Sequence, residues 1–394
     1  MKQGWEIKKL GEVVNIVNGR NQSAVISESG QYPIYGSAGN LMGYATDYLC
    51  EEGTTIIGRK GNISNPIYIE EKFWNVDTAF GLYPKNGYEP KFINYLCQTI
   101  DFKIRNRGTT IPSLVKSDLL SIDVPLISSL PEQQRIVSIL DEVFAAIAKA
   151  KTNAEQNLKN AKELFESCLH GMFEKKDEGW EETSLKSEID LLSGFAFKSK
   201  YYTKNNDDIL LIRGDNIMQG YFRWEDVKRW NKNEFEEYKR FQLFENDVVL
   251  AMDRPWVKAG LKCSMISKNE LPSLLVQRTA SLRCKKSIDS SFLFYLVKST
   301  AFTKHLLGVQ TGIGVPHISG KQILDFSFNK PPLKEQQTIV RQLDALSAEK
   351  QKLEAVYQKK VYDLEELKKS ILQRAFNGEL AEPVGELSYK TIEV

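Results

Sequence analysis

Short turns that combine arginine or lysine with glycine are the parts of this sequence best suited to chemistry with another molecule. The segment GRKGN places Arg59 and Lys60 between two glycines, with Asn62 directly after the second. Such side chains hydrogen-bond to the base edges and phosphates of DNA, and glycine lets a backbone approach a phosphate closely. For each candidate, the alternative is a solvated surface charge or a structural turn. The candidate DNA contacts are Arg20, Arg59, Lys60, Asn62, Lys103, Arg105, Arg107, Thr109, Arg213, Asn216, Arg254, Lys258 and Arg278.

A catalytic centre of the chain's own is not expected. The segment FNKPPLKEQQ is the nearest approach to the Asn/Asp-Pro-Pro-aromatic loop of an adenine methyltransferase, but Lys330 interrupts the pattern and Leu333 replaces the aromatic residue. The sequence has no G-x-x-x-x-G-K-[S/T] segment for a nucleotide-driven motor. The five cysteines form no C-x-x-C pair and the three histidines are scattered. We therefore expect neither a metal site nor a cofactor bound by this chain, and no enzymatic activity.

The charge distribution is more informative than the net charge of +2. Residues 1–130 carry 13 basic and 13 acidic side chains, whereas residues 179–330 carry 23 basic and 18 acidic ones, a net charge of +5. DNA contact must therefore come from local patches or be shared with a partner. The sequence shows no signal-peptide pattern and no apolar run of membrane-spanning length, so we expect a cytoplasmic protein.

The elements that must position these turns are repeated along the chain. GWEIKKLGEV at Gly4 matches GWEETSLKSEI at Gly179, KFINYL matches SFLFYL, and TIPSL matches GVPHI. The series ends with PEQQRIVSIL and KEQQTIVRQL, in the same order in both halves. The intervening segments, roughly 20–90 and 195–290, show no match and read as mostly β. The pattern therefore predicts a duplicated frame that carries two different inserts.

Each half ends in a proline-free stretch with apolar residues at alternating steps of four and three, which is the seam of a coiled coil. The two seams are offset by 203 residues, and their polar exceptions are Asn157, Lys350 and Lys360. The alternative is that each helix packs only on its own domain. Seam spacing does not distinguish parallel from antiparallel helices, although a pseudo-two-fold relation between the halves would make them antiparallel. The apolar seam residues include Ile136, Leu140, Val143, Ile147, Leu164, Ile339, Leu343, Leu346, Leu353, Leu364, Leu367 and Ile371.

The prediction is an α+β protein with an internal pseudo-two-fold repeat, in which two globular domains are separated by a pair of long antiparallel coiled-coil helices. The expected boundaries are 1–130 for the first domain, 131–178 for the first long helix, 179–330 for the second domain, 331–378 for the second long helix and 379–394 for a C-terminal tail.

This arrangement resembles the specificity subunit of a type I restriction-modification system. The resemblance covers essentially the whole chain and is carried by PEQQRIVSILDE, PPLKEQQTIVRQLDAL, the two GW starts and the helix end KKSILQRAFNGEL. It implies two target recognition domains that read the halves of a bipartite double-stranded DNA sequence, with the helices setting their spacing. The first helix end, LFESCLHGMFEKK, departs from the second, which puts a partner contact there in doubt.

The resemblance also implies partners. Two adenine-N6 methyltransferase subunits, which would use S-adenosylmethionine, are expected to dock beside the helices, and restriction-motor subunits are expected to join them for cleavage. The chain itself would do no covalent chemistry and would not contact a membrane. The alternative function is a coiled-coil scaffold that joins two protein-binding domains without reading DNA.

Overall fold

A computed structural model describes residues 4–174, 177–257, 260–309 and 316–380 of the protein. The chain forms two compact units: unit 1 is Met1–Glu155 with Gln358–Val394, and unit 2 is Gln156–Tyr357. The two long helices are α4, Leu130–Glu174, and α9, Leu333–Phe376. Each unit therefore contains one globular domain and a segment of both long helices. No helix among the described residues is long and apolar enough to cross a membrane.

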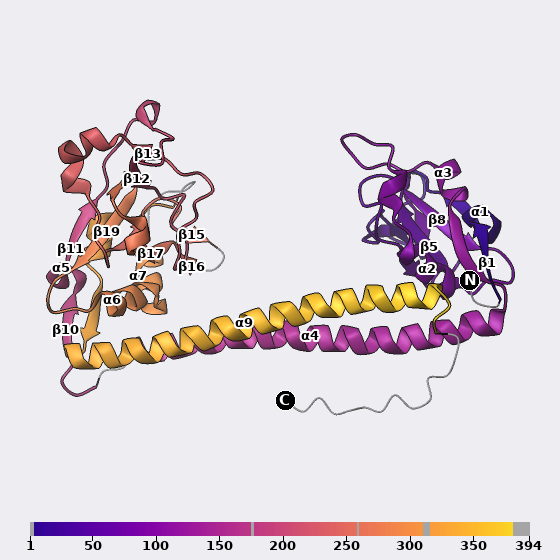
Figure 1. Cartoon of the computed structure of the whole chain (residues 1–394). Coiled ribbons are helices and arrows are strands. Elements are labelled where there is room, and N and C mark those ends of the chain that lie inside the picture. Colours follow the sequence, from indigo (N-terminus) through magenta and orange to yellow (C-terminus); the bar gives the residue numbers. More distant parts are fainter. Residues whose placement is uncertain (1–3, 175–176, 258–259, 310–315, 381–394) are drawn as a thin grey trace. The chain divides into compact units, whose positions relative to one another are not determined.

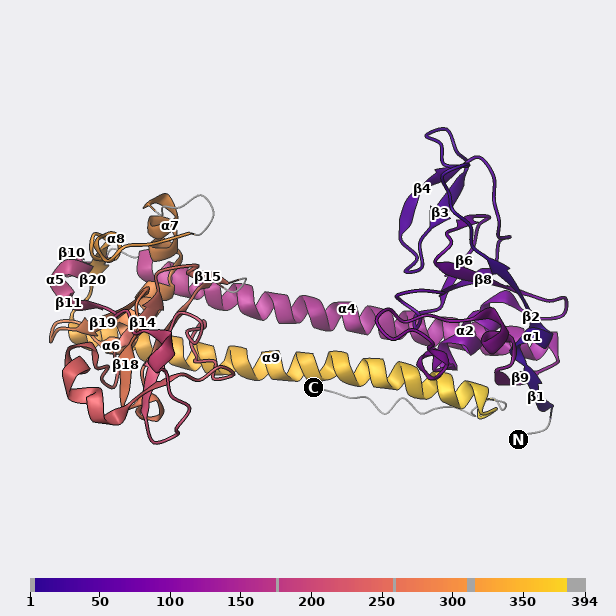
Figure 2. The ribbon, with the colours of Figure 1, turned by 90° about the horizontal axis from the view of Figure 1, so that it is seen from above.

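The domain of unit 1 is built on a four-stranded antiparallel sheet with the strand order β2-β8-β5-β6. Its central strands read TTIIG and AFGLYP, and β-branched and aromatic residues of this kind favour strands. Helix α2, Pro90–Thr99, packs on this sheet (Figure 1). A smaller sheet, β4-β3-β7, lies on the side of the domain away from α2 (Figure 2). A third pair, β1-β9, joins the two ends of the domain.

The strands of unit 1 are β1 (Trp5–Lys9), β2 (Val14–Asn18), β3 (Tyr32–Tyr35), β4 (Leu41–Ala45), β5 (Thr54–Gly58), β6 (Ile67–Ile69), β7 (Trp74–Asn75), β8 (Ala79–Pro84) and β9 (Asp123–Ile127). Its shorter helices are α1 (Leu10–Val13), α2, η1 (Phe102–Arg105) and α3 (Lys116–Leu120).

The domain of unit 2 repeats this topology. Its sheets have the orders β11-β19-β14-β17 and β13-β12-β18, with a closing pair β10-β20. The nine strands described in unit 1 each have a counterpart in unit 2, which adds the antiparallel pair β15-β16. The inserts, which differ in sequence as predicted, therefore share their strand order. The reason is that backbone hydrogen bonds and the alternation of buried positions define a sheet, and many apolar side chains satisfy both.

The strands of unit 2 are β10 (Glu181–Ser184), β11 (Ile189–Ser193), β12 (Ile209–Ile212), β13 (Arg229–Trp230), β14 (Val248–Ala251), β15 (Trp256–Val257), β16 (Gly260–Leu261), β17 (Cys263–Met265), β18 (Ser273–Leu275), β19 (Thr279–Cys284) and β20 (Ser327–Lys330). Its shorter helices are α5 (Leu185–Glu188), η2 (Ser199–Tyr201), η3 (Lys232–Phe241), η4 (Lys268–Glu270), α6 (Ser290–Lys298), α7 (Thr300–Val309) and α8 (Gly320–Leu324).

Within each unit the segments of α4 and α9 run antiparallel. In unit 1, Lys151 pairs with Glu365 at 2.7 Å, and seven residues earlier Phe144 lies under the ammonium of Lys368. In unit 2, Lys162 lies 3.9 Å from Glu354, and the ammonium of Lys350 lies 5.0 Å from the ring of Phe165. In both units the residue number rises along α4 as that of its partner on α9 falls, which defines the antiparallel sense.

The seam differs from the predicted heptad frame toward the later turns of each helix. Leu164 is 63% exposed, whereas its neighbour Phe165 is 4% exposed. On α9, Leu353 and Leu367 are also exposed, at 40% and 47%. These three assignments to the seam are wrong because a straight helix has 3.6 residues per turn and drifts about 20° per heptad from a 3.5-residue repeat. After several heptads, the next residue along the chain faces the partner helix.

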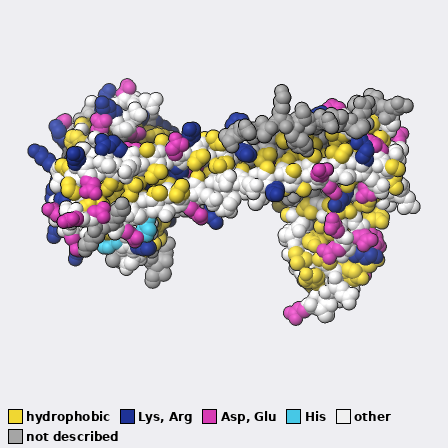
Figure 3. Space-filling view, turned by 90° about the horizontal axis from the view of Figure 1, so that it is seen from below, with side chains coloured by type: hydrophobic (Ala, Val, Ile, Leu, Met, Phe, Trp, Pro, Cys, Tyr) yellow, Lys and Arg dark blue, Asp and Glu magenta, His cyan; other side chains and the backbone are white. Residues whose placement is uncertain are grey.

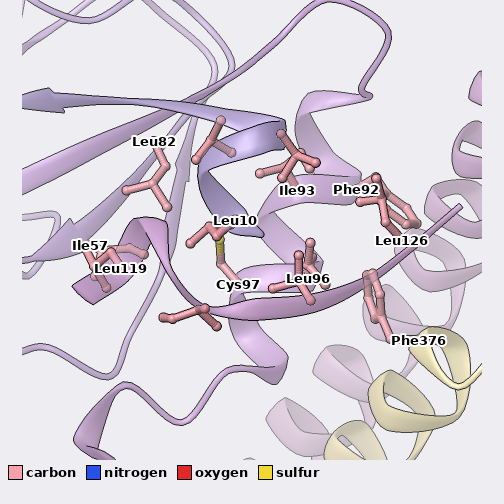
Figure 4. Packing of buried hydrophobic residues seen from close by; sticks show 14 of the residues in the cluster. Leu10, Ile57, Leu82, Phe92, Ile93, Leu96, Cys97, Leu119, Leu126 and Phe376 are labelled. Atoms are coloured by element: carbon pink, nitrogen blue, oxygen red, sulfur yellow. The ribbon is translucent and has the colours of Figure 1, made fainter. Parts of the chain in front are cut away.

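The starts of the long helices pack on their own domains as well as on the other helix. In unit 1, Ile136 and Leu140 belong to one buried cluster with Phe92 of α2 and Phe376 at the end of α9. Figure 4 shows Phe92 and Phe376 in this cluster. In unit 2, Ile339 and Leu343 occupy the equivalent cluster. The long helices therefore pack on each other along their length and on their own domains at their starts, so both of the alternatives hold in part. Among the other predicted seam residues, Ile147 is buried, and Val143, Leu346, Leu364 and Ile371 are half-buried.

Candidate nucleic-acid interface

The turn after β5 presents Arg59 and Lys60 at the surface of unit 1. Their backbone N–H groups both donate to the carbonyl oxygen of Thr78, at 2.8 and 3.1 Å. A Cβ atom on Gly58 would lie 1.9 Å from the carbonyl oxygen of Asn62, so the turn closes only with glycine at this position. The sequence thus fixes a tight turn with exposed basic side chains.

A second predicted segment, the loop 106–114, is hydrogen-bonded to this turn. The N–H of Leu114 donates to the carbonyl of Arg59, and the N–H of Gly61 donates to that of Pro112, both at 2.9 Å. The side-chain oxygen of Asn106 accepts two backbone N–H groups of its own loop, at 2.9 and 2.8 Å. The structure therefore brings GRKGN and KIRNRGTT together. The candidates on these two segments are all exposed: Arg59, Lys60, Asn62, Lys103, Arg105, Arg107 and Thr109.

Arg20 joins the same region through its backbone. Its N–H donates to the carbonyl of Asn75 at 2.9 Å, and the N–H of Gly19 donates to that of Ala79 at 3.1 Å. A Cβ atom on Gly19 would lie 1.8 Å from the carbonyl oxygen of Val76, so this close approach requires glycine. We call the turns 19–21, 59–62, 75–79 and 106–114 the first loop cluster.

Arg107 is engaged within the first loop cluster. Its guanidinium makes a bidentate contact with Asp118 of α3, at 2.8 and 3.2 Å. This hydrogen-bonded contact lowers the pKa of Asp118 below its ordinary value. Arg107 therefore holds the loop 106–114 to α3. Two of its N–H groups are used in this contact, which leaves fewer donors on Arg107 for DNA.

Two candidates in unit 2 are held by hydrogen bonds within their own domain. Asn216 is 2% exposed, accepts the N–H of Arg213 and donates to the carbonyl of Arg223. The Arg213 side chain is 17% exposed and pairs with Asp226 at 2.9 Å. A buried amide has no edge left for a base, so the prediction of DNA contact is wrong for Asn216. For Arg213 the guanidinium stabilises the chain segment around Asp226.

Arg254 and Arg278 lie together in unit 2. Both are exposed and both have left-handed backbones, with φ of +46° and +64°, which is uncommon outside glycine. They line one cavity of about 360 Å³ with Gln277, Lys262 and the third predicted residue Arg213. Burial lowers the pKa of Lys262 below its ordinary value. The candidate Lys258 lies outside the described residues.

Asp253, which was not among the candidates, also lines this cavity, and His317 lies beside it. The carboxylate of Asp253 accepts from Arg278 Nε at 3.0 Å and also contacts His317 Nδ1. The N–H of Arg254 donates to the carbonyl of Pro316 at 2.9 Å. We call the turns 252–255 and 276–279 with the segment 316–318 the second loop cluster.

The two loop clusters share one backbone scaffold. Lys60 forms a β-bridge with Ser113, and Asp253 forms one with His317. Pro112 and Pro316 accept equivalent hydrogen bonds, from Gly61 and Arg254. The repeat of TIPSL and GVPHI was the available signal, since Pro112–Ser113 and Pro316–His317 bind the turn in each unit. What differs between the clusters is the set of side chains.

Charged residues of both signs are interspersed with apolar ones on the face shown in Figure 3. This mixture on one face agrees with the small net charge of the chain. Among the described residues, no group of three or more His, Cys, Asp or Glu side chains could hold a metal ion.

The comparison with protein families matches residues 2–158 and 177–360 to the type I restriction modification DNA specificity domain. The specificity subunit of the type I restriction enzyme MjaVIII from Methanocaldococcus jannaschii is 25% identical, over 96% of this chain and 93% of its own length. The EcoAI specificity subunit from Escherichia coli is 36% identical over a shorter region, 43% of this chain and 28% of its own length.

Two solved structures share the fold. A chain from a structure of the assembly and conformational transition of a type I R-M system superposes with a TM-score of 0.78, at 17% identity, over 95% of this chain and 98% of its own. The HsdS subunit from Thermoanaerobacter tengcongensis gives a TM-score of 0.57 at 18% identity, over 96% and 98% of the two chains.

Proposed function

The chain belongs to the family of the type I restriction modification DNA specificity domain, and on that premise we propose that its two loop clusters read the two halves of a bipartite DNA target. The protein is a DNA sequence-specificity subunit that docks methyltransferase and restriction subunits. The alternative, a scaffold that joins two protein-binding domains without reading DNA, is not favoured.

The main support for this proposal is that the two loop clusters share one backbone structure but carry different side chains. Lys60 in the first cluster and Asp253 in the second occupy the same backbone position but have opposite charges. The next residue is Gly61 in one cluster and Arg254 in the other. A protein that needed two copies of one binding site would keep those side chains alike. Two half-sites of different sequence need two different readers on a common frame.

The side chains available in each cluster suit DNA. Arg59 and Lys60 can contact phosphates or the acceptor edge of guanine, which arginine can bind with two donors. In the second cluster, Asp253 orients the Arg278 guanidinium, and this favours a fixed geometry over a mobile phosphate contact. We therefore expect Arg278 to read a base and Lys60 to contact the backbone of DNA.

The remaining chemistry belongs to partners in this proposal. We place the methyl transfer in two adenine-N6 methyltransferase subunits that hold S-adenosylmethionine, and DNA cleavage in restriction-motor subunits. The chain itself is proposed to bind no cofactor and to catalyse no reaction. We place it in the cytoplasm, where its DNA and partners would be.

Methylation sequencing tests the proposal. DNA from cells that express this chain with its methyltransferase partner should carry a bipartite methyladenine motif that disappears when the chain is deleted. Replacing residues 20–90 with the corresponding segment of a relative should change one half of the motif and leave the other half unchanged. An active methyltransferase that leaves no motif in the presence of this chain would contradict the proposal.

A further inference from the structure

The duplicated glutamine pair at the start of each long helix contains one buried and one exposed residue. Gln133 and Gln336 are fully buried, at 0% exposure, whereas Gln134 and Gln337 are exposed. Burying an amide without hydrogen-bond partners is costly. We therefore expect the side chains of Gln133 and Gln336 to have partners inside the protein, which Gln134 and Gln337 do not need because water can reach them.

Both buried amides are satisfied in the same way. Gln133 Oε1 accepts the N–H of Glu89 at 2.8 Å, and its Nε2 donates to the carbonyl of Ile127 at 2.7 Å. Gln336 Oε1 accepts the N–H of Asp289 at 2.8 Å, and its Nε2 donates to the carbonyl of Pro331, also at 2.8 Å. Glu89 and Asp289 are the residues that immediately precede α2 and α6. Each glutamine therefore fastens the long helix to the first turn of a domain helix.

A tyrosine–aspartate hydrogen bond forms a second link between the domain helix and the long helix, two turns further along the long helix. Tyr95 of α2 donates to Asp141 of α4, and Tyr295 of α6 donates to Asp344 of α9 at 2.7 Å. Burial and the adjacent carboxylate raise the pKa of both tyrosines above the ordinary value, so each keeps its proton and remains a donor.

The end of the other long helix completes each fastening. Phe376 of α9 packs on Phe92 with ring centroids 5.0 Å apart (Figure 4), and Phe173 of α4 packs on Phe292 at 5.2 Å. These helix ends are the segments KKSILQRAFNGEL and LFESCLHGMFEKK, whose difference suggested an uncertain partner contact. Each contributes a phenylalanine to a domain core. We call the glutamine, the tyrosine–aspartate pair and the phenylalanine pair of one unit its mount.

In each unit, one domain helix and two strands connect the mount to the loop cluster. In unit 1, α2 packs on β5 and β8, and the turns that follow β5 and precede β8 belong to the first loop cluster. In unit 2, α6 packs on β14 and β19, which carry the second loop cluster in the same way. A small rotation of α2 or α6 on its long helix would therefore shift the DNA-reading turns.

We propose that Gln133 and Gln336 are positioning residues that fix the spacing of the two half-sites in the DNA target, an inference that rests on the proposed function. The buried amide of each one sets the orientation of a reading domain on its helices. Its Oε1 accepts the N–H that precedes the domain helix, and its Nε2 donates to the chain that leads into the long helix, and in Gln336 also to the carbonyl of Ser287 at 3.2 Å. The identity of the bases is read elsewhere, in the loop clusters. Loss of the amide relaxes the spacing that the complex accepts and leaves the base preference of each half-site unchanged.

The test uses the full chain in complex with its methyltransferase partner. Its substrates are duplexes that carry the target found by methylation sequencing, either with the natural spacer or with one base pair added or removed. The readout is the ratio of the methylation rate on the natural spacer to the rate on the altered spacers. Gln336→Leu should lower this ratio by about five- to tenfold, the effect expected when a buried hydrogen-bonding pair is lost. Gln337→Leu is the matched control and should leave the ratio unchanged.

Tyr295→Phe keeps the ring and removes only the hydroxyl that donates to Asp344, so it decides the question if Gln336→Leu does not fold. It should lower the same ratio, by a smaller factor. If both rates fall together and the ratio stays at the wild-type value, the mount is merely structural and the inference is wrong. A wild-type complex that methylates no DNA at all would overturn the proposed function, and this inference with it.

Discussion

Lys60 and Asp253 occupy the same position in the two domains. Each forms a β-bridge to the residue that follows a proline, Ser113 in one unit and His317 in the other. The two side chains carry opposite charges on a common backbone. The duplication therefore keeps the hydrogen bonds that shape the turn and leaves the side chains free to differ, which is what separates a reading surface from its frame.

Lys60→Ala should weaken DNA binding without changing the methylated sequence. A lysine that neutralises one phosphate releases about one counterion, so the slope of log K against log salt concentration should decrease by about 1. Fluorescence anisotropy across a salt series measures the slope for the complex. Lys9→Ala is the control, because Lys9 is an exposed basic residue that pairs with Asp123 outside the loop cluster. If Lys60→Ala leaves the slope unchanged, Lys60 does not contact a DNA phosphate.

Arg278→Ala should relax the sequence preference at one position of one half-site. Loss of a guanidinium that reads a base costs about 1–3 kcal/mol of discrimination. Methylation sequencing of cells with the variant should show degeneracy at that position, while the other half-site stays intact. Lys239→Ala, an exposed charge on η3, serves as the control. Equal weakening on all sequences would identify Arg278 as a phosphate contact instead.

Acid should destabilise unit 2 through Glu188. Burial alone would raise the pKa of this carboxyl, but hydrogen bonds from Lys330 and Ser287 lower it below the ordinary 4.5. The interaction therefore stabilises the folded state above pH 4.5, and the stabilisation is lost as the pH falls through the lowered value. Hydrogen exchange in β10 and β20 should show a shallower loss of protection with acid for Glu188→Gln. The exposed Glu182→Gln should behave like wild type; a wild-type profile for Glu188→Gln would contradict the assignment.

The sequence predicted the long helices and the repeat well because both depend on local patterns. Pro131 and Pro332 stand at the starts of the two helices, and apolar residues recur along both. The common topology of the inserts could not be predicted, because different side chains satisfy the same strand pairing. The burial of Asn216 was also hidden, since its partner Arg223 lies beyond a turn whose geometry the sequence does not determine. Candidate DNA contacts such as Arg20 and Arg59 could be found from the sequence because each follows a glycine. In the structure Gly19 and Gly58 lie close to other backbone segments, where a side chain would not fit.

Leu164 and Phe165 offer a direct test of the helix seam. A strict heptad repeat places Leu164 against α9, whereas the structure places Phe165 there, in contact with Lys350. Phe165→Ala should therefore lower the free energy of unfolding of unit 2 by about 3–5 kcal/mol, because it opens a cavity in a buried cluster. Leu164→Ala removes a side chain that is 63% exposed and should change the stability by less than about 0.5 kcal/mol. Denaturant unfolding followed by hydrogen exchange in α6 separates the two variants. The reverse order of effects would restore the heptad frame, since it would show that the helices supercoil enough to keep a 3.5-residue repeat in register.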